Sequence, residues 1–216
     1  MEEFIMTKVA VISADGRIAG NVIKELVARG YDVTGFGRRD ENTTGAQTYI
    51  KKDLFDLTKA DLAEFEIVVS AFGTWRPETF HLYVDVIKHL TSLLGKTGKR
   101  FVIVGGAGSL YVDPEHKTQL VDTPDFPAEF YALAKAQTDA LTELRKHDDV
   151  AWTFISPAVG LQVDGKRTGE YILAGEELTL NDRGESIISY ADYALAMADE
   201  IQNGDHIQER ISVVRK

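Results

Sequence analysis

Apolar residues in this chain occur either in short unbroken runs or at the spacing of a helix. The first run, Val9–Ile12, is typical of a strand that is buried on both faces of a parallel sheet. Apolar residues then recur every three or four positions from Ile18 to Val27, and Gly30 follows them. This spacing predicts an amphipathic helix that ends at the glycine. A four-residue turn, Ser13–Gly16, joins the predicted strand to the helix.

The same alternation of strand and helix patterns continues to the end of the chain. Further strands are predicted at residues 32–36, 48–50, 67–69, 101–104, 151–155 and 211–214. Further helices are predicted at residues 59–64, 77–94, 127–146 and 190–202, and a small hairpin over residues 165–180. This order predicts an α/β protein with one doubly wound parallel sheet of the Rossmann type. We expect a single domain over residues 1–216, with a core at 7–160 and a C-terminal, substrate-side elaboration at 161–216 packing on it.

Composition and charge limit the classes of function. The chain of 216 residues has 44% hydrophobic and 27% charged residues, as is ordinary for a soluble globular domain. Its formal net charge of −10 argues against binding to nucleic acid or to an anionic membrane. The chain contains no cysteine, so it has no thiolate ligands, and its histidines lack metal-ligand spacing. Since the start MEEFIMTK is too short for a signal peptide and no apolar run could span a bilayer, we expect a cytoplasmic monomer or homodimer without a metal.

The turn after the first strand has the features of a phosphate-binding site. A buried strand that turns sharply into a helix presents free N–H groups and the positive end of the helix dipole beyond the sheet. Gly16 and Gly20 remove side chains where a ligand or a strand must approach. In the pattern G-x-x-G-x-x-G, Ser13 and Ala19 replace the outer glycines. The Cβ of Ser13 either crowds a diphosphate or requires a strained backbone, and the alternative is an ordinary turn without a ligand.

Four other strand ends carry residues that suit the same ligand. They are Gly37–Arg39, Ala71–Trp75, Gly105–Ser109 and Ser156–Ala158. Ligands of open α/β sheets bind beyond the carboxyl ends of the strands, so these ends together predict a dinucleotide site. Arg38 and Arg39 stand where an acidic residue would bind the ribose of NAD, and their guanidinium groups suit a 2′-phosphate. NADP(H) is therefore favoured over NAD(H), although Asp40 leaves open that this loop is only a solvated charged segment.

The motifs at these ends, with three further segments, identify a family. They are SADGRIAG, VVSAFG, VIVGGAGSL, TPDFPAEF, WTFISPA and GESIISYADYALAMADEI. The set resembles atypical short-chain dehydrogenase/reductases, and more narrowly the NAD(P)H-binding family of NADH-flavin reductase-like proteins. The resemblance covers nearly the whole chain, and it implies a Rossmann-type fold that holds NAD(P) with a pocket over the nicotinamide.

The resemblance also implies a role for individual residues. The cofactor's diphosphate would lie at Gly16, Arg17 and the Ile18 amide, with Ser13 and Asp15 as cofactor-binding residues of the same turn. The adenosine would lie at Arg38, Arg39, Asp53 and Leu54. The nicotinamide ribose would lie at Ala71, Phe72 and Gly73, and the nicotinamide ring between Ser109 and the segment Ser156, Pro157 and Ala158.

Ser109, Tyr131 and Lys135 separate two catalytic hypotheses, because reduction of a carbonyl would use these residues and reduction of a flavin would not. Tyr131 and Lys135 spell Y-x-x-x-K and lie one helical turn apart, so the phenol could donate a proton to a carbonyl polarised by Ser109. These three residues would make the chain a short-chain carbonyl reductase or epimerase. The family's more usual tyrosine falls at Phe130, however, so Tyr131 can point elsewhere.

Reduction of a flavin requires no enzyme acid, because hydride passes from nicotinamide C4 to flavin N5 and solvent supplies a proton. Trp75 and Tyr111 could border a flat acceptor, and Arg76 could pair with its phosphate or carboxylate. The leading hypothesis is an NAD(P)H-dependent oxidoreductase acting on a small molecule such as FMN, another flavin or a quinone. A non-catalytic NAD(P)-sensing regulator is the alternative of a different class. Weaker binding of the diphosphate at Ser13 would suit such a regulator.

Overall fold

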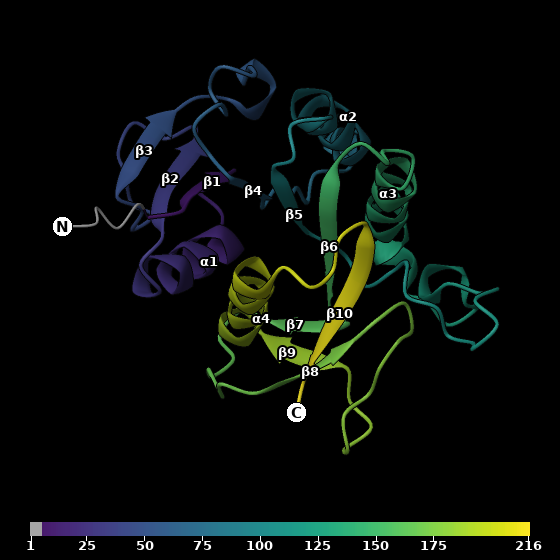
Figure 1. Cartoon of the computed structure of the whole chain (residues 1–216). Helices are drawn as coiled ribbons and strands as arrows, with labels where there is room; N and C mark the ends of the chain where they lie inside the picture. The colour runs from purple at the N-terminus through teal and green to yellow at the C-terminus, as the bar shows by residue number, and fades with distance from the viewer. Residues whose placement is uncertain (1–5) are drawn as a thin grey trace.

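A computed structural model describes residues 6–216, so the acidic start at residues 1–5 lies outside the described part. The main sheet has eight strands in the order β3-β2-β1-β4-β5-β6-β10-β8 (Figure 1). The parallel strands are β1 (Lys8–Ile12), β2 (Asp32–Gly37), β3 (Thr48–Lys51), β4 (Ile67–Ser70), β5 (Arg100–Val104), β6 (Ala151–Pro157) and β10 (Glu209–Arg215). The edge strand β8 (Tyr171–Ala174) is antiparallel to β10. The doubly wound α/β fold is therefore confirmed, and the strand order reverses on the two sides of β1.

Helices cover both faces of the sheet. Helices α1 (Arg17–Ala28) and α4 (Tyr190–Asn203) pack together on one face, and α2 (Leu82–Leu94) and α3 (Ala128–Leu144) pack together on the other (Figure 1). Alternate residues of β1 belong to the two layers, because side chains alternate along a strand. Val9 and Val11 lie in the core cluster with α1 and α4, whereas Ala10 and Ile12 lie in the cluster with α2 and α3.

The last quarter of the chain is part of these layers. Residues 161–216, expected as an elaboration, supply α4 to one layer and the strand β10, which lies in the sheet between β6 and the edge strand β8. A second sheet of two parallel strands consists of β7 (Gly160–Gln162) and β9 (Ile187–Ser189). In residues 6–216, no helix combines the length and the apolar character needed to cross a membrane.

Two predicted elements, at 59–64 and 165–180, and the start of the predicted helix 77–94 are wrong. Residues 59–64 form turns rather than a helix, because the segment is short and the Asp61 carboxylate accepts hydrogen bonds from both the amide and the hydroxyl of Thr58. Proline 77 begins only a 3₁₀ turn, Pro77–Thr79, and α2 starts at Leu82.

The predicted hairpin at 165–180 is also absent. Strand β8 pairs with β10, which lies about a fifth of the chain away, and β7 pairs with β9. The remaining short helical turns are Leu54–Asp56 and Leu120–Asp122.

Candidate functional site

The turn between β1 and α1 presents backbone N–H groups without a side-chain cap. Gly16 is the N-cap residue, and it is exposed, as is Arg17. The first backbone amide of the turn to bond within the helix is that of Gly20, which donates to the Gly16 carbonyl over 3.0 Å. The amides of the three residues before it, Arg17, Ile18 and Ala19, have no acceptor in an α-helix. The residues at this turn therefore fit an anion such as a diphosphate.

Ser13 adopts the left-handed backbone conformation that favours glycine. Its φ is 59°, and its carbonyl accepts a hydrogen bond from the amide of Gly16 over 3.2 Å. The next residue, Ala14, donates its amide to the Phe36 carbonyl over 2.9 Å, which fixes the turn against β2. Of the two consequences predicted for a side chain at position 13, the strained backbone is the one observed.

Asp15 connects this turn to the end of β2. Its carboxylate accepts hydrogen bonds from the amide of Arg38, over 2.7 Å, and from the Tyr49 hydroxyl, over 2.9 Å. The Tyr49 oxygen also accepts a bond from the amide of Arg39 over 3.0 Å. A Cβ at Gly37 would lie 2.4 Å from the Tyr49 oxygen, so only glycine fits there. Tyr49 is a residue that sequence reasoning missed, since a tyrosine in a short edge strand predicts only packing.

The two arginines after β2 are exposed at the rim of this site. The Arg39 guanidinium donates to the Thr43 hydroxyl over 3.0 Å, and its Nε lies 3.9 Å from the Asp15 carboxylate. The neighbouring Asp40 forms an ion pair with Lys51, and this hydrogen bond lowers the pKa of the Asp40 carboxyl. Because Lys51 balances Asp40, that carboxylate does not cancel the positive charge of Arg38 and Arg39.

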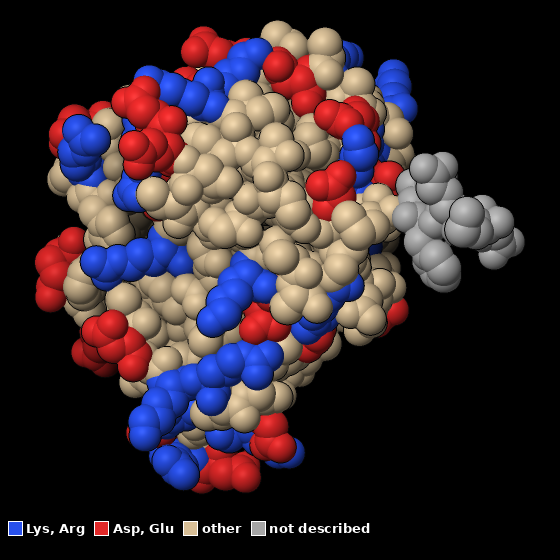
Figure 2. Space-filling model, turned by 90° about the vertical axis from the view of Figure 1, so that its left-hand side faces the viewer, with Lys and Arg blue, Asp and Glu red and all other residues tan. Residues whose placement is uncertain are grey.

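Asp53 and Leu54, which are predicted to lie beside the adenine, follow the end of β3. Asp53 caps the short 3₁₀ turn there, where its carboxylate accepts the Phe55 amide over 3.0 Å. Figure 2 shows acidic and basic side chains mixed around an uncharged area on one face of the molecule. That face therefore carries no field of a single sign.

The loop after β4 is held by a buried tyrosine of α2. The hydroxyl of Tyr83 accepts a hydrogen bond from the amide of Thr74 and donates one to the Thr74 carbonyl, each over 3.1 Å. The ring of Phe72 packs edge-on against Tyr83, with 5.3 Å between the centroids. Burial raises the pKa of Tyr83. Trp75, one residue past this anchor, is 75% exposed, and Arg76 beside it is also exposed.

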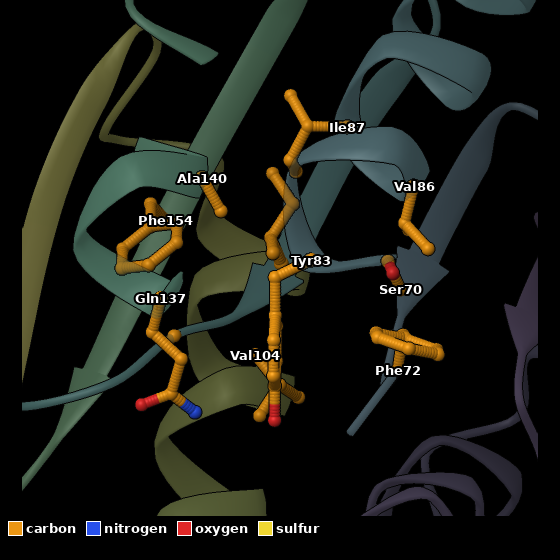
Figure 3. A pocket seen from close by; sticks show the side chains of 11 residues that line it. Ser70, Phe72, Tyr83, Val86, Ile87, Val104, Gln137, Ala140 and Phe154 are labelled. Atoms are coloured by element: carbon orange, nitrogen blue, oxygen red, sulfur yellow. The ribbon is translucent and has the colours of Figure 1, made fainter. Parts of the chain in front are cut away.

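A cavity of about 20 Å³, close to the volume of one water molecule, lies next to Tyr83. Figure 3 shows the carboxamide of Gln137 on the same side as the Tyr83 hydroxyl, with Ser70 and Phe72 across from them. Other lining residues come from α2, β5, β6 and α3, and they are Val86, Ile87, Ile103, Val104, Gly105, Ala140 and Phe154. Sequence reasoning missed Tyr83, because nothing in the local sequence shows that its hydroxyl reaches the backbone of Thr74.

The glycines after β5 allow close packing of neighbouring elements. A Cβ would lie 2.3 Å from the Phe154 ring at Gly105, 2.2 Å from the Gln137 side chain at Gly106 and 2.8 Å from Ala134 at Gly108. The residues at this strand end are therefore small because α3 and β6 pack closely against them.

The residues predicted to flank a nicotinamide ring are all buried. The hydroxyl of Ser156 donates to the Gly106 carbonyl over 2.9 Å, so it holds the glycine turn in place. The two residues that follow it, Pro157 and Ala158, are buried as well. Ser109, in the loop after the neighbouring strand β5, is also buried.

The structure does not assemble Ser109, Tyr131 and Lys135 into a hydrogen-bonded set. Lys135 forms an ion pair with Asp139, one turn further along α3. Tyr131 borders a shallow groove with Val121, Asp122, Thr123, Phe126 and Ala128. Within residues 6–216, no hydrogen bond joins any two of the three predicted catalytic side chains.

The long loop after Ser109 is fastened along its length. Tyr111 exchanges backbone hydrogen bonds with Glu176 and Leu178, and its ring stacks on His116 at 4.5 Å. The buried guanidinium of Arg210 binds the Glu176 carboxylate at 2.5 Å and the Ser109 carbonyl at 3.1 Å. Tyr111, predicted to contact a substrate, is thus part of a fixed loop rather than of a free flap.

Taken together, the reversal of strand order at β1, the uncapped α1 and the residues after β2 and β4 define a dinucleotide-binding α/β protein. Comparison with known proteins agrees with this class. The model of a family described as NAD(P)H-binding matches residues 13–203, and the chain belongs to that family.

Relatives match over nearly the full length. A Streptococcus pneumoniae protein, SP1627, described as a candidate NADH-flavin reductase, has a crystal structure with 51% identity and a TM-score of 0.95, covering 97% of this chain and 100% of that one. YwnB of Bacillus subtilis, an uncharacterised protein, is 41% identical over 210 residues, which is 96% of this chain and 98% of YwnB. A Burkholderia pseudomallei protein, described as a candidate exported protein, is 36% identical with a TM-score of 0.85, covering 97% and 100%.

Proposed function

We propose that this protein is an NADPH-preferring reductase that transfers hydride to a flat small-molecule acceptor, a flavin or a quinone. The main support is the uncapped first turn of α1 beside two exposed arginines, because these groups suit a diphosphate and a ribose 2′-phosphate. Membership of the NAD(P)H-binding family and the similarity to a candidate NADH-flavin reductase support a nicotinamide cofactor.

Each group then has a defined part in binding. The amides that open α1 bind the diphosphate, and Asp15 orients the loop that carries Arg38 and Arg39 toward the 2′-phosphate. Tyr83 holds the Thr74 backbone, which keeps Phe72 and Trp75 at the end of β4. A bound dinucleotide would supply the hydride.

The carbonyl reductase hypothesis has less support from the geometry. A catalytic phenol needs a neighbouring ammonium that lowers its pKa, but Lys135 is already paired with Asp139. The sensing hypothesis shares the cofactor site with our proposal, and only turnover separates the two.

Steady-state oxidation of NADPH, followed by its absorbance with FMN, riboflavin or a quinone as acceptor, tests the proposal. We expect turnover with at least one ring acceptor and a lower KM for NADPH than for NADH. Binding of NADPH without turnover on any acceptor would favour the sensing regulator. Turnover that requires a carbonyl substrate and is lost in Tyr131→Phe would favour the carbonyl reductase.

A further inference from the structure

Phe130 and Tyr131 are neighbours in the first turn of α3 and have almost equal exposure. The exposed fractions are 47% for Phe130 and 46% for Tyr131. An α-helix turns by roughly 100° per residue, so the two rings nevertheless leave the helix in different directions. Because the two rings are equally exposed but point in different directions, variants of Phe130 and Tyr131 can be compared with each other.

Phe130 lies on the face of α3 that packs toward the end of β5. Two later residues of that face are fixed by close approach to the glycine turn, Ala134 at Gly108 and Gln137 at Gly106. Phe130 precedes Ala134 by four positions and Gln137 by seven, so the three share one side of the helix. Because Ala134 is buried and Phe130 is half exposed, the ring stands where the protein interior ends.

Tyr131 leaves the helix on another side. It precedes Lys135 by four positions, and Lys135 pairs with Asp139 on a solvent-accessible part of α3. The Tyr131 ring borders the shallow groove formed with Val121 and Phe126. It is therefore directed toward the loop before α3 rather than along the face that carries Gln137.

The helix face that Phe130 shares with Gln137 is connected through Tyr83 to the loop that carries Trp75. Gln137 lies beside the Tyr83 hydroxyl (Figure 3), and that hydroxyl holds Thr74, the residue before Trp75. Thr74 follows β4 and the glycine turn follows β5, and these two strands are adjacent in the sheet. Trp75 thus belongs to the loop after β4, and Phe130 shares the helix face that packs on the turn after the neighbouring strand β5, on the predicted nicotinamide side of the site.

We propose that Phe130 contacts the hydride acceptor and, with Trp75, forms an apolar platform that selects planar ring systems. This inference rests on the function proposed above. A phenyl ring offers a stacking surface but no ionisable proton, so this contact suits an acceptor that takes its proton from solvent. For a flavin, hydride transfer breaks the C4–H bond of the dihydronicotinamide and forms an N5–H bond, the flavin gains both electrons, and water protonates N1.

The experiment compares Phe130→Ala with Tyr131→Ala in steady-state assays at saturating NADPH. We expect the KM for riboflavin to rise about tenfold in Phe130→Ala, because aromatic stacking and apolar contact are lost, and to change less than about twofold in Tyr131→Ala. The rise should be smaller for benzoquinone, whose single ring covers less of the platform. The Kd for NADPH should be the same in the wild type and both variants.

Two results would overturn the inference, and they are distinguishable. If the wild type oxidises NADPH with riboflavin but Phe130→Ala and Tyr131→Ala have equal KM values, the acceptor does not contact Phe130, while the proposed function stands. If the wild type has no turnover with any acceptor, the function and the inference both fail. Should Phe130→Ala not fold, as judged by thermal denaturation, Phe130→Leu replaces it, with an expected rise of about threefold.

Discussion

Ser13 illustrates at the scale of one residue how a local rule can be broken within a site. A serine with a φ of 59° occupies a conformation that costs an L-residue about 1–2 kcal/mol relative to glycine. The turn nonetheless keeps its shape, because the Ala14 amide bonds to Phe36 and the Ser13 carbonyl accepts the Gly16 amide. Strain of this kind at a strand end is typical of functional positions.

Replacing Ser13 by glycine should therefore stabilise the protein and improve cofactor binding. We expect Ser13→Gly to raise the free energy of unfolding by about 0.5–1 kcal/mol, since the gain at positive φ exceeds the entropy cost of glycine. Removal of the Cβ should also lower the Kd for NADPH several-fold. Denaturant unfolding and calorimetry measure the two effects. Ser13→Ala is the matched control, since it keeps the Cβ, and equal behaviour of the two variants would contradict this account.

At the scale of elements, most strands and helices could be predicted from the sequence because their apolar runs are bounded by glycine, proline or charged residues. The strand at Val9–Ile12 and the helix after Gly16 are confirmed in this way. The segment 165–180 was mispredicted because its apolar residues at β8 pair with β10, a partner that local patterns do not reveal. The same limit applies to Tyr49 and Tyr83, whose hydroxyls bond residues from other elements.

The start of α4 depends on a buried carboxylate. Asp192 accepts hydrogen bonds from the amides of Thr168 and Gly169, each over 2.9 Å, and from the hydroxyl of Ser189, which caps the helix. Burial alone would raise the pKa of Asp192, but the hydrogen bonds from Gly169 and Thr168 outweigh it and hold the pKa below its ordinary value. The ionised carboxylate thus joins the loop before β8 to the helix.

Removal of this carboxylate should destabilise the protein in a pH-dependent way. We expect Asp192→Ala to lower the free energy of unfolding by about 1–3 kcal/mol at pH 7, because the amides of Thr168 and Gly169 lose their charged acceptor. A depressed pKa stabilises the folded state above the unfolded pKa, so this advantage should fade as the pH drops below about 4. Urea unfolding at several pH values measures it, with Asp205→Ala, an exposed carboxylate beyond α4, as the control. A loss that is independent of pH would contradict the assignment.

At the scale of the whole molecule, the site forms because the strand order reverses around β1. Strands β2 and β4 lie on either side of β1, so the arginines after β2 and the anchored loop after β4 flank the opening of α1. The sequence alone predicts this convergence, because parallel strands bring their carboxyl ends to one edge. What it leaves undetermined is which face of α3 packs on the end of β5, and the contacts at Gly106 and Gly108 show that it is the face of Ala134 and Gln137, which Phe130 shares.

Calorimetric titration of NADPH and NADH into the wild-type protein and into the double variant Arg38→Ala/Arg39→Ala tests the central claim most directly. We expect the wild type to bind NADPH at least about tenfold more tightly than NADH, because a guanidinium–phosphate contact contributes about 1.5–3 kcal/mol. The double variant should bind both coenzymes equally, with the affinity for NADH unchanged. A wild-type protein that binds neither coenzyme would contradict the claim that the opening of α1 holds a dinucleotide.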